Sequence, residues 1–214
     1  MHLTNDNLQP IYSISQDKNG IVCIQLNPHS VTQTSILNKL SIFLDHCLQL
    51  LSQASTKGLL FYPPFTEAEQ DYQKLVLEAK RNPQFDVELA ALLTKSAGLQ
   101  EFNKPFIGLI AGLCSDLNLA CMLMGSHRYA SAEAHLGFHL SNFGLFPGFG
   151  AAIRLSRMLP MQDALALLSE GQTLQASQAL AIGLVDKLAK DKDALIARAA
   201  ADILHGLSSK QKSQ

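Results

Sequence analysis

Short apolar segments alternate with longer segments of helical periodicity along the chain, and this alternation constrains the fold most. Residues 21–26 (IVCIQL) are rich in β-branched side chains and follow an Asn-Gly turn pair, as expected of a strand. Residues 35–53 then repeat apolar side chains every three or four positions, the period of an amphipathic helix. A second strand is predicted over 59–62 because the two prolines that follow cannot donate to a sheet. Strand, helix and strand in this order favour a parallel α/β sheet.

The same alternation continues to the end of the chain. The further predicted elements are a helix over 66–98 that begins with a Thr66–Glu69 capping box and is interrupted at Asn82-Pro83, a strand over 106–110, a helix from 112 to 125, a strand over 128–130, helices over 150–159, 161–170 and 176–181, a strand over 183–186 and a helix over 189–207. Without a repeat or a low-complexity linker, we expect one domain over 1–214. Its core spans about 20–188, and 189–214 form a short C-terminal helix with a frayed tail.

Composition narrows the class of protein. The 214 residues are 47% hydrophobic and 16% charged with a formal net charge of −1, so nothing favours a nucleic-acid or anionic-membrane partner. The first ten residues lack the features of a signal peptide and the apolar runs are too short for a membrane span, so a cytoplasmic location is expected. The four cysteines are predicted to be small buried thiols rather than disulfides or metal ligands: Cys23, Cys47, Cys114 and Cys121.

Two polar residues interrupt the otherwise apolar stretch GLCSDLNLACMLMG, residues 112–125. Asp116 and Asn118 follow a predicted strand and begin a predicted helix. Both residue types are typical N-caps, and a carboxylate suits the positive end of a helix. Alternatively, the same strand-to-helix turn faces a ligand and presents free amides to a carbonyl group. The sequence leaves both interpretations open.

Other candidate groups lie downstream. His135 and His139 are four residues apart but lack a helical pattern between them, so no metal site is predicted. His139 next to Ser141 has the chemistry of a base or donor, and a structural imidazole is the alternative. Four phenylalanines gather around a glycine-rich loop and could line either a pocket or a subunit contact: Phe138, Phe143, Phe146 and Phe149.

Taken together, the later segments resemble the enoyl-CoA hydratase/isomerase (crotonase) superfamily. The resemblance is carried by KPFIGLIAG, ACMLMGSHRYASAEAHLGF, FGLFPGFGAAIRL and LSEGQTLQASQALAIGLVDKL, in the order and spacing of that family. It implies an α/β crotonase-like fold, a spiral ββα core with peripheral helices, here with a shortened C-terminal helical region. It also implies an acyl-CoA thioester as ligand or substrate, no resident cofactor, and a homotrimer or hexamer.

The resemblance also implies where the family's chemistry should lie. The glycine run of the family falls on residues 116–118, and its two catalytic glutamates fall on Ala120 and Leu140. Neither side chain can transfer a proton, so ordinary two-glutamate hydration is not expected. One oxyanion amide would belong to Leu117. The second is expected after the second strand, where two prolines lack an N–H and Phe65 is the nearest donor.

Two functions therefore remain in view. The first is a degenerate member of the family that is non-catalytic or binds an acyl thioester, with a role as a ligand-binding or assembly subunit. The alternative is an atypical acyl-CoA or acyl-carrier isomerase, decarboxylase or hydrolase. Its candidate catalytic residues are Asp116, His139 and Ser141. Whether the chain is an enzyme is left open, because the fold alone cannot decide it.

Overall fold

A six-stranded sheet forms the centre of the protein in the computed structural model, which describes residues 11–27, 35–65, 76–77, 79–143 and 148–208. Its strands, in spatial order, are β1 (Tyr12–Gln16), β2 (Ile21–Leu26), β3 (Gly58–Phe61), β4 (Phe106–Ile110), β6 (His127–Ser131) and β9 (Lys187–Ala189). β1 and β2 form an antiparallel hairpin, and every later neighbour pairs in parallel. Parallel strands need crossover connections, and these carry the helices.

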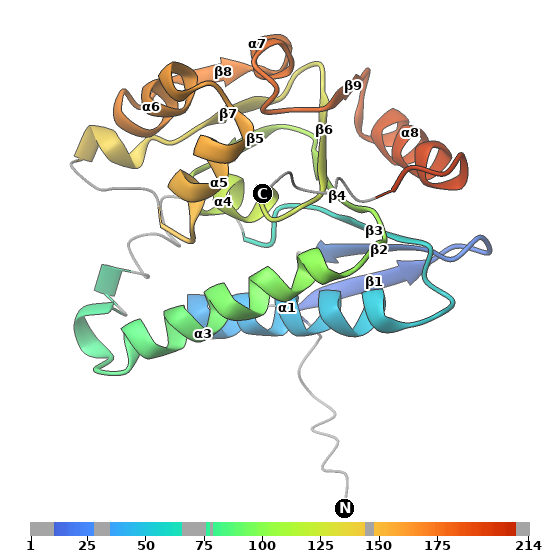
Figure 1. Cartoon of the computed structure of the whole chain (residues 1–214), viewed down its shortest axis with the longest axis horizontal. Helices are drawn as coiled ribbons and strands as arrows, with labels where there is room; N and C mark the ends of the chain where they lie inside the picture. Colours follow the sequence, from blue (N-terminus) through green and yellow to red (C-terminus); the bar gives the residue numbers. More distant parts are fainter. Residues whose placement is uncertain (1–10, 28–34, 66–75, 78, 144–147, 209–214) are drawn as a thin grey trace, which may run out of the picture.

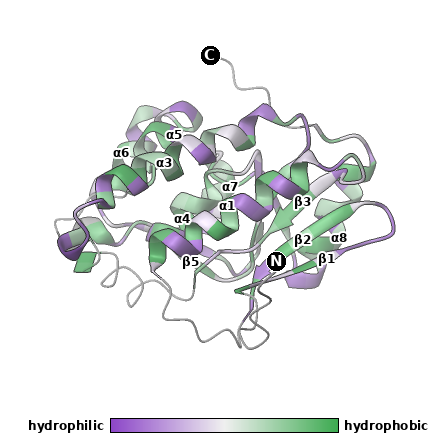
Figure 2. Ribbon diagram, turned by 90° about the horizontal axis from the view of Figure 1, so that it is seen from below, coloured by the Kyte–Doolittle hydropathy of each residue, from purple (hydrophilic) through white to green (hydrophobic). Residues whose placement is uncertain are grey.

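Helices cover both faces of this sheet. On one face α1 (Ile36–Ser52) lies beside α3 (Phe85–Gly98), as Figure 1 shows, and on the other lies α8 (Lys192–Leu204). Successive strand residues point to opposite faces. Phe61 accordingly packs in the α1 core, whereas Leu60 packs with Ile203 of α8. In Figure 2, α1 alternates hydrophilic and hydrophobic turns, while β2 and β3 beside it are largely hydrophobic.

A second, three-stranded sheet extends from the main one. Its order is β5 (Leu113–Ser115), β7 (His135–Gly137) and β8 (Thr173–Gln175), with β5 and β7 parallel and β8 antiparallel. Around it lie short helices, which Figure 1 shows together with this sheet on the side opposite α1 and α3: α4 (Asp116–Met122), α5 (Ala151–Met158), α6 (Met161–Ser169) and α7 (Ala176–Ala181). Two 3-10 turns are also present among the described residues, η1 (Leu99–Glu101) and η2 (Leu140–Phe143).

The long periodic elements match the sequence predictions closely. The predicted helix over 35–53 is α1 with Ser35 as its N-cap, and the strand over 106–110 is β4. The predicted strand over 183–186 is wrong, because those residues form turns and bends and the chain joins the sheet only at β9. The last helix begins at Lys192 rather than 189. The Thr66–Glu69 capping box lies outside the described residues.

Side-chain burial tests two further expectations. All four cysteines are free thiols; three are buried and Cys23 is half-buried. Phe138 and Phe149 are in the main core, with 0% and 6% of their surface exposed, so neither offers a surface to a second subunit. Phe143 and Phe146 are outside the side chains described. Within the described part of the chain, no helix is long and apolar enough to cross a membrane.

Candidate functional site

The turn between β5 and α4 places two polar side chains inside the core. All seven residues of α4 are buried, Asp116 and Asn118 included. Asp116 has a φ of 49°, in the left-handed region that aspartate tolerates better than most non-glycine residues. The chain therefore turns sharply from strand to helix at this residue. Its side chain leaves the helix and points toward another segment.

Asp116 bonds to the segment that follows β7. Its Oδ1 accepts the backbone N–H of Leu140 at 3.1 Å, and its Oδ2 lies 3.7 Å from Nδ1 of His139. Burial raises the pKa of the Asp116 carboxyl, and the Leu140 amide and His139 oppose that shift without cancelling it. The capping interpretation is wrong for this residue, because the N-cap position belongs to Ser115 and Asp116 is the first residue of the helix.

Asn118 forms a two-point bracket with the backbone of Phe65. The Phe65 N–H donates to Asn118 Oδ1 at 3.1 Å, and Asn118 Nδ2 donates back to the Phe65 carbonyl at 3.0 Å. We call this pair of bonds the Asn118–Phe65 bracket. Both residues are about 5% exposed, so the bonds form away from solvent. Asn118 is thus a tie between α4 and the segment after β3, rather than a helix cap.

The two backbone amides expected to act as oxyanion donors differ in whether they already have a partner. Leu117 is the second residue of α4, so its amide has no intrahelical carbonyl to bind. The Phe65 amide, by contrast, is already donated to Asn118. The adjacent Pro64 carbonyl accepts the hydroxyl of Tyr12 at 3.2 Å, which further fixes this segment. A ligand oxygen could use both amides only if it displaced the Asn118 side chain.

The two positions where the resemblance places the family glutamates are apolar and enclosed. Ala120 is 1% exposed and Leu140 is 9% exposed. Asp116 precedes Ala120 by four residues on α4, but its φ of 49° directs its side chain away from the helix. Its carboxylate instead accepts the Leu140 amide. One carboxylate therefore lies at the Leu140 position, although Leu140 itself carries none.

His139 connects the buried acid to an exposed hydroxyl. Its Nε2 lies 2.7 Å from Oγ1 of Thr173, the first residue of β8, while Nδ1 faces Asp116. Sequence reasoning missed Thr173, because β8 is three residues long and carries no recognisable motif. Ser141 lies in η2 next to this group, but its side chain is outside those described. In the described part of the chain, no cluster of three or more His, Cys, Asp or Glu side chains could hold a metal ion.

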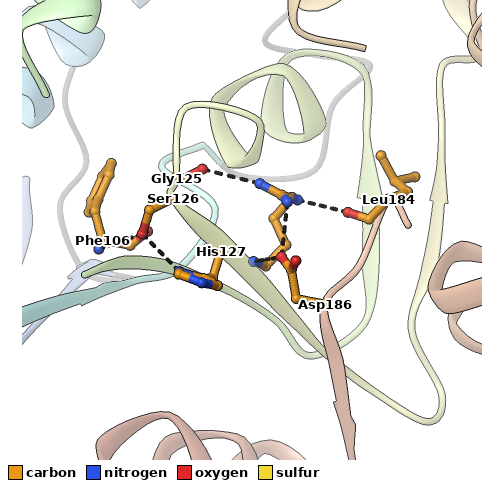
Figure 3. Close-up of polar contacts among 7 residues, drawn as sticks. Phe106, Gly125, Ser126, His127, Leu184 and Asp186 are labelled. Carbon is orange, nitrogen blue, oxygen red and sulfur yellow. Dashed lines mark hydrogen bonds and ion pairs between the residues drawn. The ribbon is translucent and has the colours of Figure 1, made fainter. Parts of the chain in front are cut away.

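A buried arginine, Arg128 of β6, binds the segment that precedes β9; Figure 3 shows its partners Gly125, Leu184 and Asp186. Arg128 Nη1 and Nε donate to the carbonyls of Gly125 and Leu184, at 3.1 and 2.7 Å. Nη2 and the Arg128 backbone N–H both bind Oδ2 of Asp186, at 2.9 and 2.8 Å. The side chains are 4% and 12% exposed, so this pair is largely removed from water. We call these contacts the Arg128 clamp.

The fold defines a class of α/β protein that many solved structures share. Enoyl-CoA hydratases from Bacillus anthracis and Thermoplasma volcanium match with TM-scores of 0.72 each, at 22% and 20% identity. The alignments cover 92% and 94% of this chain, and 76% and 79% of those chains. An enoyl-CoA hydratase from Polaromonas sp. JS666 matches at a TM-score of 0.74 with 19% identity, over 90% of this chain and 76% of that one. The crotonase-like fold expected from the sequence is therefore confirmed.

The family follows from the sequence itself. The sequence model described as enoyl-CoA hydratase/isomerase matches residues 69–212, about two thirds of the chain. The protein belongs to the enoyl-CoA hydratase/isomerase family.

Proposed function

We propose that this protein binds acyl thioesters without hydrating them. The observation that carries the proposal is the Asn118–Phe65 bracket, which engages the backbone amide expected to polarise a thioester carbonyl. Removing one oxyanion donor typically costs about 100- to 1,000-fold in rate. The apolar side chains of Ala120 and Leu140 add to this loss, because neither can deliver or remove a proton at the double bond.

Thioester binding is supported by family membership and by the amide of Leu117. That amide stands at the N-terminus of a buried helix, where an N–H lacks an intrahelical partner. A single donor can orient a carbonyl oxygen in the site without the full charge stabilisation that hydration requires. Binding and turnover are thus separable in this chain.

The test has two arms, both on the purified full chain. Calorimetric titration with CoA, acetyl-CoA and crotonyl-CoA is expected to show affinity of micromolar order for the thioesters. Loss of the conjugated thioester absorbance of crotonyl-CoA is expected to stay at the uncatalysed rate. Hydration above that rate would refute the proposal. Absence of heat and of thermal shift with all three compounds would refute thioester binding and favour a role as an assembly subunit.

A second function is favoured by one specific contact, the approach of Asp116 to His139. A buried carboxylate facing an imidazole at 3.7 Å can hold that ring in one orientation. This supports an atypical acyl-CoA or acyl-carrier isomerase, decarboxylase or hydrolase that uses one of these two groups. A turnover screen over these reaction classes tests it. Asp116→Asn and His139→Gln are both expected to abolish any activity found, and an activity that survives both excludes this route.

Assembly stays a prediction at the level of a homotrimer or hexamer. Helices α5 and α6 expose large apolar side chains, with Ile153, Met161 and Leu165 each more than half exposed, which supports a subunit contact on that side. Light scattering of the purified chain, with Leu165→Glu as a disrupting variant, measures the number of copies. A monomer in the wild type would refute it. The cytoplasmic location also stays a prediction.

A further inference from the structure

Three side chains from three separate segments of the chain follow one another from the core to the surface. Thr173 Oγ1 is 2.7 Å from His139 Nε2, and His139 Nδ1 is 3.7 Å from Asp116 Oδ2. A hydroxyl, an imidazole and a carboxylate in this order are the parts of an activated nucleophile. We propose that Thr173 is a nucleophile for acyl transfer, with His139 as its base and Asp116 as the group that orients His139.

The solvent exposure of the three groups increases from the orienting acid to the base and then to the nucleophile, as these roles require. The Asp116 side chain is 7% exposed, the His139 side chain is 33% exposed, and Thr173 is exposed at the start of β8. The acid is thus held by the core, the base lies at the boundary, and the hydroxyl can meet an acyl donor without any opening of the core. The geometry of this group does not involve the Asn118–Phe65 bracket.

The backbone around Thr173 fixes the position of its hydroxyl. Gly137 of β7 pairs with Thr173, and a Cβ at Gly137 would collide with the carbonyl oxygen of Gln172. Gly171 has a φ of 62°, and a side chain there would strike the amide of Asn142. Glycine at these two places lets the chain at β8 approach β7 and η2 closely. This close approach brings the Thr173 hydroxyl within hydrogen-bond distance of the histidine that follows β7.

The orientation of the imidazole suits proton removal. Because the Asp116 carboxylate faces Nδ1, the tautomer with its proton on Nδ1 is favoured, and Nε2 is then free to accept. In that tautomer the Thr173 hydroxyl, 2.7 Å away, donates to Nε2. Asp116 is itself held by the Leu140 amide, so the ring faces a fixed charge. Asp116 is accordingly a positioning residue, while Thr173 and His139 would touch the reacting atoms.

The reaction is an acyl transfer to Thr173 and then to water. Oγ1 attacks the acyl carbonyl as His139 Nε2 takes the hydroxyl proton. The tetrahedral adduct collapses with cleavage of the carbon–sulfur or carbon–oxygen bond, and the leaving thiol or alcohol receives that proton. Water then attacks the threonine ester with His139 again as base. The carboxylic acid leaves, and the Thr173 hydroxyl is restored without any oxidant or reductant.

This inference deepens the second proposed function by naming the nucleophile and the reaction class, and it rests on that function. A donor without CoA separates the two. We would incubate the full chain with p-nitrophenyl acetate, and separately with acetyl-CoA, and follow release of nitrophenol or free thiol. Intact-mass measurement and peptide mapping would then locate the acetyl group. In samples quenched with acid during the first turnover, before water cleaves the threonine ester, we expect one acetyl group per chain, on Thr173.

Three variants and one control test the assignment. Thr173→Val keeps the shape without the hydroxyl and should lose acetylation, whereas Thr173→Ser should keep it on the new hydroxyl. His139→Gln should slow it by at least about 100-fold, the usual contribution of a positioned base. The control is Thr94→Val on α3, whose exposed hydroxyl bonds only to its own helix in the contacts described, with the Ala90 carbonyl. It should react at the wild-type rate.

The outcomes are decisive in each direction. Wild-type acetylation in Thr173→Val, an acetyl group mapped elsewhere, or no acetylation with either donor would overturn the inference. The Thr173 pair decides the matter even if His139→Gln fails to fold, because Thr173 is exposed and both replacements fit its space. Thioester binding by calorimetry without acetylation would reject this inference alone. Acetylation of Thr173 by p-nitrophenyl acetate without binding of any CoA compound would reject both proposed acyl-CoA functions and leave the assignment of the nucleophile standing.

Discussion

Replacing Asn118 by alanine tests the bracket that the proposed function rests on. The substitution removes the acceptor for the Phe65 N–H and the donor to the Phe65 carbonyl, two groups in a residue that is 4% exposed. A buried polar group left without a partner costs about 1–3 kcal/mol, so two such groups should lower the free energy of unfolding by about 2–4 kcal/mol once some relaxation is allowed. Urea unfolding followed by circular dichroism measures this loss.

The same variant has a second readout in ligand binding. With the Asn118 side chain gone, the Phe65 amide becomes available to a thioester oxygen, so acetyl-CoA should bind more tightly than to the wild type. Hydration of crotonyl-CoA should remain absent, because Ala120 and Leu140 still carry no carboxylate. The matched control is Asn38→Ala on the exposed side of α1, which should change stability by less than about 0.5 kcal/mol. An equally small change in Asn118→Ala would refute the reasoning.

Three further substitutions probe charge and packing. Burial raises the pKa of the Asp116 carboxyl, so ionisation of this group destabilises the folded protein as the pH rises from the unfolded pKa through the folded one. Asp116→Asn should therefore stabilise the protein at neutral pH and lose that advantage in acid. Urea unfolding midpoints over a pH series measure both effects. Arg128→Met should cost about 3–5 kcal/mol, because it removes the buried guanidinium from the Asp186 carboxylate, and a loss under 1 kcal/mol in the same assay would contradict the clamp. Gly58→Ala should cost about 1–3 kcal/mol, since a Cβ there would lie 2.7 Å from Cδ1 of Ile203; adding Ile203→Val should recover part of that loss, and no recovery would argue against this contact.

The sequence predicted well those elements that carry either a long periodic pattern of buried residues or a continuous apolar run. Helix α1 carries seven buried side chains over 17 residues. Strand β4 is buried at all five positions, which makes it a continuous apolar run. Strands β5, β7 and β8 have three residues each, too few to show any alternation. The second sheet was therefore not predicted.

The candidate site was harder to predict because its contacts join distant segments. Asp116 and Asn118 stood out as polar residues in an apolar stretch, but their partners lie 24 and 53 residues away. From local sequence rules, helix capping was the expected role of these two side chains. In the structure they bind distant backbone groups instead. Thr173 meets His139 across 34 residues, through a strand pairing that no local pattern encodes. The residue types that matter were visible in the sequence, whereas their partnerships required the fold.

The Arg128 clamp has a consequence for how the protein opens. Arg128 binds Leu184 and Asp186, 56 and 58 residues later, so the chain between them leaves the main sheet and returns to the same point. β7, η2 and β8 all lie within this excursion, while Asp116 lies before it. Segments closed at one base tend to exchange their amide hydrogens as a cooperative unit. Sub-global unfolding of this segment would move His139 and Thr173 together, while Asp116 stays in the folded part. The stability of the Arg128 clamp therefore determines how long Asp116 and His139 stay in contact.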